Sequence, residues 1–140
     1  MMSSSPPART VASPMVRHGW LAAAFVLAFL ATGSMHWTLP YSEVELPNSL
    51  LRPALIGVLV AAMVARVFGR NGFLITTLVI GAAVPAAIAA RVMMDTATDP
   101  TSHNLWPFEL FLGGFVGHAC AALGSLIVLP WVKKARNAST

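Results

Sequence analysis

Charged side chains are scarce in this chain of 140 residues. Lys, Arg, Asp and Glu together make up 10% of the sequence, whereas hydrophobic residues make up 56%. A soluble domain carries roughly 25% charged residues. Because the few charges fall between long apolar runs, the composition excludes an ordinary soluble domain and predicts an integral membrane protein whose main partner is the lipid bilayer.

Cysteine is also nearly absent, since Cys120 is the only one. This excludes an intrachain disulfide and any metal site built from several cysteines. The net charge is +4, but the basic residues form no patch interleaved with aromatic side chains, so we expect no nucleic-acid partner. The sequence contains no phosphate loop and no activated nucleophile, and we therefore expect a non-enzymatic protein without a cofactor or a metal ion.

Long apolar runs are what the sequence does contain. They predict four membrane-spanning helices, at about residues 19–37, 52–68, 73–94 and 107–132. Together these helices form one all-α domain over residues 19–134, an integral membrane four-helix bundle. Residues 1–18 are rich in Ser and Pro and predict a disordered tail, and residues 135–140 form a second tail.

The first apolar run has two interpretations. Its basic flank and the small residues Ala31-Thr-Gly33 are typical of a cleavable signal peptide. Trp20 and Trp37 at its two ends favour a retained helix, because indole rings lie at both membrane interfaces. We favour the retained helix.

Two local features interrupt the apolar pattern. Pro85 lies in the middle of the third run and predicts a kink, because proline lacks the backbone donor that a helix needs. Between the second and third runs, residues 69–72 (Gly-Arg-Asn-Gly) predict a tight turn in which Gly and Asn adopt positive φ.

The distribution of charge predicts an orientation. If the N-terminus is inside, only Arg52 and Arg91 of the nine basic residues fall outside, together with all five acidic residues. Basic residues of short loops concentrate on the cytoplasmic side of membrane proteins. We therefore expect a multi-pass protein of the cell inner membrane with both termini in the cytoplasm.

Small residues line one face of the second run and one face of the fourth. They are Gly57, Ala61 and Ala65, and Gly113, Gly117 and Ala121. Such residues let helix backbones approach closely in lipid, where hydrophobicity alone does not drive association. The favoured interpretation is packing within one chain. The alternative is contact with a second copy of the chain.

Three ionisable residues within or directly after the third and fourth runs are candidate sites. His118 is predicted to lie roughly 18 Å deep, where an ionisable side chain is a functional hypothesis. The structural alternative is a neutral His that donates one hydrogen bond to a neighbouring carbonyl or hydroxyl. Arg91 and Asp95 are one helical turn apart, which favours a local ion pair. The alternative makes Arg91 the base of an outward-facing anion site.

The polar loop at residues 95–109 is the remaining candidate. Asp99 and Asn104 are explained as helix caps. Two Asp and a His are present, but their spacing matches no established metal signature. Capping does not account for His103 and Glu109, which we interpret as candidate contacts for a ligand or a partner.

Residues 99–109 (DPTSHNLWPFE) resemble a loop of uncharacterised small four-helix inner-membrane proteins of proteobacteria. The resemblance is confined to this loop and the four-span layout, and it implies no activity. Small multidrug transporters differ from this chain, because they carry a membrane-embedded Glu in their first helix. Residues 19–37 contain no acidic residue.

Three functions are compatible with these features. The first is an accessory or interaction subunit that contacts a larger membrane protein, or a second copy, through its small-residue helix faces and its outward-facing loop. The second is a small oligomeric transporter or channel that uses Pro85, His118 and the glycine face of the fourth helix. A membrane enzyme or redox subunit is the third. We favour the first.

Overall fold

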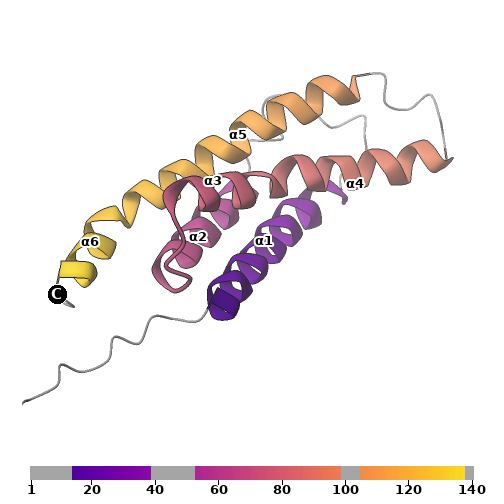
Figure 1. Cartoon of the computed structure of the whole chain (residues 1–140). Coiled ribbons are helices and arrows are strands. Elements are labelled where there is room, and N and C mark those ends of the chain that lie inside the picture. The colour runs from indigo at the N-terminus through magenta and orange to yellow at the C-terminus, as the bar shows by residue number, and fades with distance from the viewer. Residues whose placement is uncertain (1–13, 39–52, 99–104, 138–140) are drawn as a thin grey trace, which may run out of the picture.

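The computed structural model describes residues 14–38, 53–98 and 105–137, and these residues are helical with short turns and no strand (Figure 1). The helices are α1 (Pro14–His36), α2 (Ala54–Val67), α3 (Phe73–Gly81), α4 (Ala83–Thr98), α5 (Trp106–Ile127) and α6 (Leu129–Asn137). The all-α class is therefore confirmed. Most of the predicted N-terminal tail, and residues 99–104 of the polar loop, lie outside the described residues.

Three helical stretches are long and apolar enough to cross a membrane, namely Pro14–His36, Phe73–Ala97 and Trp106–Ile127. At 1.5 Å per residue the shortest of them reaches about 33 Å, and the hydrocarbon core of a bilayer is about 30 Å thick. The chain is therefore a membrane protein by the length and composition of its helices. The apolar helix α2 has 14 residues and reaches only about 21 Å.

Several helix boundaries differ from those predicted. The third run continues to Thr98 instead of ending at about 94, so the first residues of the polar loop are helical. α1 begins at Pro14, so residues 14–18 belong to a helix and not to the tail. Proline suits a first helical position, because the amide there has no intrahelical acceptor. The predicted span 107–132 is divided at Val128 into α5 and α6. Pro130 has no amide hydrogen to donate to the carbonyl of Leu126, which explains the division.

The kink predicted from Pro85 takes the form of a break between α3 and α4 at Ala82. Two helical hydrogen bonds remain, one from the Ala82 amide to the Leu78 carbonyl and one from the Ala86 amide to the Ala82 carbonyl, each 3.1 Å long. Pro85 has no amide hydrogen for the carbonyl of Gly81. The break therefore lies one turn before the proline.

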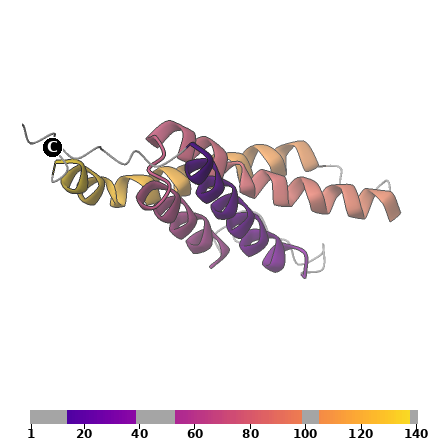
Figure 2. The same cartoon turned by 60° about the horizontal axis from the view of Figure 1, so that its bottom comes forward.

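The helices pack around a core of small and β-branched residues. α5 contacts α2, α3 and α4, and α1 contacts α2 and α4 (Figures 1 and 2). Six residues with 2% or less exposure represent the core: Val58, Ala62, Ile80, Val84, Ile88 and Ala121. Bulky side chains such as Phe111 and Phe115 of α5 are exposed instead. This distribution is the one that membrane helices show, because small residues permit close packing and large ones face lipid.

The small-residue faces lie inside the molecule. A Cβ atom on Gly117 would lie 2.5 Å from the Gly81 carbonyl oxygen, and one on Gly57 would lie 2.8 Å from the Ala31 Cβ. Gly113 and Ala121 are buried on the same face of α5, as are Ala61 and Ala65 on α2. The two faces thus serve the packing within one chain, and this packing covers them.

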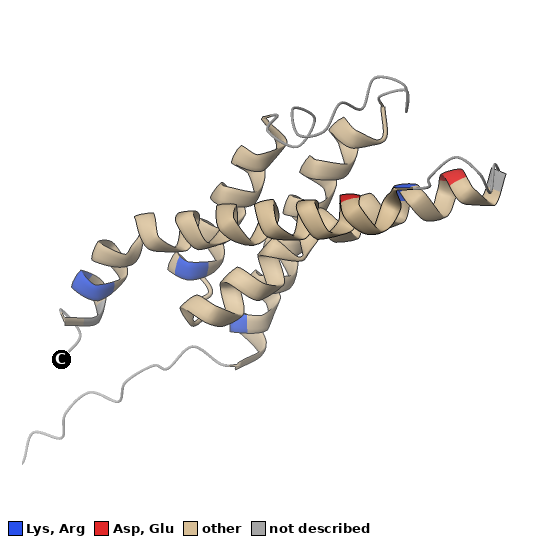
Figure 3. Cartoon of the chain, turned by 90° about the horizontal axis from the view of Figure 1, so that it is seen from above, with Lys and Arg blue, Asp and Glu red and all other residues tan. Residues whose placement is uncertain are grey.

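The described charged residues divide between the two ends of the helices (Figure 3). The end at which α1 begins, called the basic end here, holds Arg17, Arg66, Arg70, Lys133 and Lys134. The end at which α5 begins, called the acidic end, holds Arg91, Asp95 and Glu109. These two ends contain the candidate sites.

Candidate functional site

Arg91 joins two helices at the acidic end. Its side chain is buried, and its Nε atom donates to Oδ2 of Asp95 one turn later in α4, at 3.2 Å. Its Nη1 atom donates to the carbonyl oxygen of His36 at the end of α1. The Trp37 indole nitrogen adds a second connection, since it donates to the Ala87 carbonyl oxygen at 3.1 Å. The Arg91 guanidinium is therefore directed at acceptors of the chain itself.

Glu109 is buried without a partner in the described part of the chain. The residue as a whole is 6% exposed. Its carboxylate forms no hydrogen bond or ion pair within residues 14–38, 53–98 and 105–137. Its position in the first turn of α5 places it at the positive end of the helix dipole. Glu109 is thus an available acceptor at the acidic end.

Three other polar residues of the loop, His103, Asp99 and Asn104, lie outside the described residues. The N-cap position of α5 is held by Leu105, whose side chain makes no capping hydrogen bond, and a proline occupies the first turn. Of the two loop residues that capping left unexplained, Glu109 is therefore the one whose surroundings are known.

His118 lies beside the break between α3 and α4. Its Nδ1 atom is 2.6 Å from the carbonyl oxygen of Gly114 one turn earlier in α5. Because a carbonyl only accepts, Nδ1 carries the hydrogen and donates it. A Cβ atom on Gly81 would lie 2.8 Å from both Cα and Cδ2 of His118. This hydrogen bond to a nearby carbonyl is the contact that the structural alternative predicts for His118.

Groups for catalysis or metal binding do not come together in the described segments. Nowhere in residues 14–38, 53–98 and 105–137 do three His, Cys, Asp or Glu side chains form a cluster that would hold a metal ion. Cys120 is half-buried and free, and Ser125 is fully buried with no hydrogen bond to its hydroxyl. Neither side chain has a base beside it that would activate it as a nucleophile.

The turn at the basic end is held by side chains. The Arg66 Nη1 atom donates to the Asn71 carbonyl oxygen at 2.6 Å. The Asn71 amide nitrogen lies 3.3 Å from the carbonyl oxygens of both Arg17 and Ala65, and donates to them. These bonds tie the turn to the beginning of α1.

Positive φ in this turn occurs at a residue that the sequence did not indicate. Arg70 has a φ of 49°, and no glycine of the described chain has positive φ. Gly69 is needed for space instead, because a Cβ there would lie 2.4 Å from the Asn71 amide nitrogen and 2.6 Å from the Ala65 carbonyl oxygen. The predicted turn is present, but the assignment of positive φ to Gly and Asn is wrong. The bonds of Asn71 fix the chain so that Arg70 takes the left-handed conformation.

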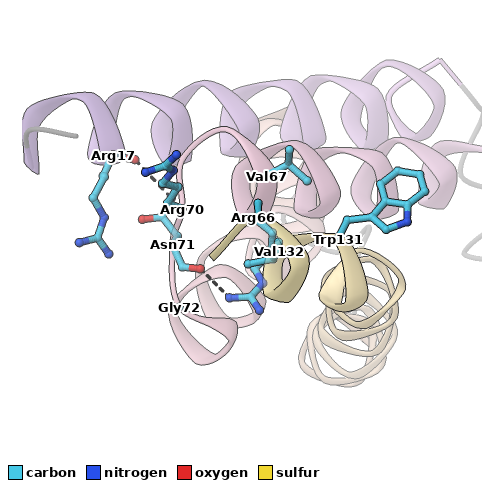
Figure 4. A pocket seen from close by; sticks show the side chains of 9 residues that line it. Arg17, Arg66, Val67, Arg70, Asn71, Gly72, Trp131 and Val132 are labelled. Carbon is cyan, nitrogen blue, oxygen red and sulfur yellow. Dashed lines mark hydrogen bonds between the residues drawn. The ribbon is translucent and has the colours of Figure 1, made fainter. Parts of the chain in front are cut away.

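A cavity of about 530 Å³ opens at the basic end (Figure 4). It lies between the start of α1, the turn before α3, and α6. The lining residues are Arg17, Arg66, Val67, Arg70, Asn71, Gly72, Trp131, Val132 and Ala135. Three of them are arginines and none is acidic. From the sequence alone these arginines indicate only the orientation of the chain in the membrane, because the cavity is formed by segments that lie far apart in the sequence.

Comparison of the chain with protein-family models, with curated proteins and with solved structures finds no match. The resemblance of residues 99–109 to a loop of small proteobacterial membrane proteins therefore gains no support from these comparisons.

Proposed function

We propose that the chain is a four-helix bundle of the cell inner membrane, with both termini in the cytoplasm. α2 supports this topology as the fourth span, because it runs antiparallel to α1. Asn71, just beyond α2, contacts Arg17 near the start of α1, and Gly57 lies against Ala31 near its end. The basic end then faces the cytoplasm, in agreement with the positive-inside rule.

We propose further that the protein is non-enzymatic and acts as an accessory or interaction subunit. Its contact surface is the acidic end, which faces away from the cytoplasm. The observation that carries this proposal is Glu109, which is 6% exposed and whose carboxylate makes no hydrogen bond or ion pair within the described residues. The partner's contribution is a Lys or Arg side chain, because a basic group pairs with a carboxylate both electrostatically and by hydrogen bonding.

Other candidate contacts already have partners within the chain. Arg91 bonds to Asp95 and to the end of α1, and His118 bonds to its own helix. The small-residue faces are covered by intrachain packing. Homo-oligomer contact through those faces is therefore disfavoured, and a different protein is the partner that we propose.

The test is affinity purification of the full-length protein in mild detergent, followed by mass spectrometry of what co-purifies. The wild type should retain a larger membrane protein, and Glu109→Gln, which keeps the size of the side chain but removes its charge, should lose most of it. Asp95→Asn is the matched control, because it removes an acidic charge at the same end from a group that already has a partner. Purification of the wild type as a lone monomer would contradict the proposal, and so would equal loss of the partner in both variants.

The second candidate is a small oligomeric transporter or channel. The observation that favours it is the break between α3 and α4 beside His118, because discontinuous helices and ionisable side chains within the membrane are features of transport pathways. It predicts ion or substrate flux in liposomes that His118→Ala changes and that Cys120→Ala, a nearby change on the same helix, leaves alone. Flux that is unaltered in His118→Ala would remove His118 from this pathway.

A further inference from the structure

The described residues that line the cavity at the basic end include three arginines and no acidic residue. Arg17 comes from α1, Arg66 from the last turn of α2, and Arg70 from the turn before α3 (Figure 4). The acidic residues of the described chain, Asp95 and Glu109, lie at the opposite end. Cations that share one cavity repel one another, and a bound anion would relieve this repulsion.

The side chains of two of these arginines are wholly or partly buried. Arg66 is 7% exposed, and its guanidinium is fixed by its hydrogen bond to the Asn71 carbonyl oxygen. The Nε atom of Arg17 is buried and has no hydrogen-bond partner in the structure. A buried donor without an acceptor is costly, which is the condition that an anionic ligand corrects.

The cavity also has the size and the walls of a ligand site. Its volume of about 530 Å³ exceeds the space that a single inorganic anion needs and falls within the usual range for small-molecule sites. Trp131 and Val132 of α6 add an apolar wall beside the arginines. A ligand with an anionic head and an attached organic group fits this combination.

We propose that this cavity binds a phosphate-bearing anion through Arg17, Arg66 and Arg70. The planar guanidinium forms paired hydrogen bonds with phosphate oxygens, which makes arginine the preferred residue for such groups. Two sources offer this chemistry, namely the headgroup of an anionic phospholipid and a soluble phosphate ester. The site is distinct from the acidic end, and it does not depend on the partner proposed for Glu109.

The experiment uses the full-length protein, purified in a non-ionic detergent and stripped of lipid, with adducts read by native mass spectrometry. The probes are phosphatidylglycerol, zwitterionic phosphatidylcholine, glycerol 3-phosphate and inorganic phosphate. Binding of phosphatidylglycerol in preference to phosphatidylcholine, with no glycerol 3-phosphate adduct, identifies a lipid headgroup site. A glycerol 3-phosphate or phosphate adduct identifies a site for soluble phosphate compounds.

Two double variants distinguish binding in this cavity from nonspecific electrostatic binding to the basic end. The double variant Arg17→Gln/Arg70→Gln should bind the preferred probe at least about tenfold more weakly, because charged hydrogen bonds are lost. Lys133→Gln/Lys134→Gln removes the same charge at the same end without altering the lining, and its affinity should fall less than about threefold, since exposed charges are screened.

Folding of each variant is checked by its helical content and melting temperature in the same detergent. Arg70 is exposed, so Arg70→Gln alone provides the comparison if the double variant does not fold. The proposal is overturned if no phosphate probe forms an adduct with the wild type. It is also overturned if the lysine pair and the arginine pair weaken binding equally.

Discussion

At the residue scale, two glycines in α5 differ in what surrounds them. A Cβ on Gly117 would lie 2.5 Å from the Gly81 carbonyl oxygen and 2.9 Å from the Val84 side chain, whereas one on Gly114 meets nothing closer than Pro85 Cγ at 4.0 Å. A backbone carbonyl cannot move aside to make room for a Cβ atom, as the end of a flexible side chain can. Close packing of α3 on α5 therefore depends on Gly117 and not on Gly114.

We expect Gly117→Ala to lower the free energy of unfolding by about 1–3 kcal/mol, as overpacking of a well-packed core does. Gly114→Ala should change it by less than about 1 kcal/mol, because its Cβ has room and alanine favours the helix. Circular dichroism during thermal unfolding in one detergent measures both variants. Equal destabilisation by the two substitutions would show that the backbones of α3 and α5 do not approach as described.

At the scale of the helices, Arg91 is the tie between α4 and the end of α1. Its bond to the His36 carbonyl spans 55 residues of sequence, whereas its bond to Asp95 is local. Arg91→Gln removes both and should lower the free energy of unfolding by about 1–3 kcal/mol. Asp95→Asn should cost less than about 1 kcal/mol, because that carboxylate is 38% exposed. Unfolding curves in a denaturing detergent compare them, and a larger loss from Asp95→Asn would disprove the tie.

The helices themselves were largely predictable from the sequence, because apolar runs of membrane length have few alternatives to a helix. Pro85 likewise marked the break in the third run, and the alternation of small and bulky residues marked the packed face of α5. Pro130, like Pro85, lacks a backbone amide hydrogen. The division between α5 and α6 could therefore have been predicted in the same way.

What the sequence did not reveal depends on contacts between distant residues. Arg70 has positive φ because Asn71 beside it is bonded to Arg17, which lies 54 residues away in the sequence. The basic cavity arises only when the start of α1, the end of α2 and α6 meet. No local pattern reports such a meeting, and so the arginines could be interpreted only as charges near a membrane surface.

For the molecule as a whole, the short helix α2 supports the proposed topology of four crossings. It ends at the basic end, where Asn71 bonds to the start of α1. It begins near the level of Ala31, which lies about 8 Å before the end of α1 at His36. Since α1 ends at the acidic end and α2 ends at the basic end, α2 is the return crossing in the proposed topology. Three long helices and one shorter helix then give four crossings.

Four crossings place both termini on the same side, and three would place them on opposite sides. We expect green fluorescent protein fused after Thr140 to be fluorescent in bacteria, as fusions in the cytoplasm are. Alkaline phosphatase fused after Ala97 should be active, because that position lies at the acidic end, and a phosphatase fusion after Asn71 should be inactive. An active fusion after Asn71 would mean that the basic end faces outward, and the positive-inside assignment would then be reversed. A phosphatase fusion after Thr140 that is active, with the Asn71 fusion still inactive, would instead mean that only one of the two long helices after Asn71 crosses the membrane.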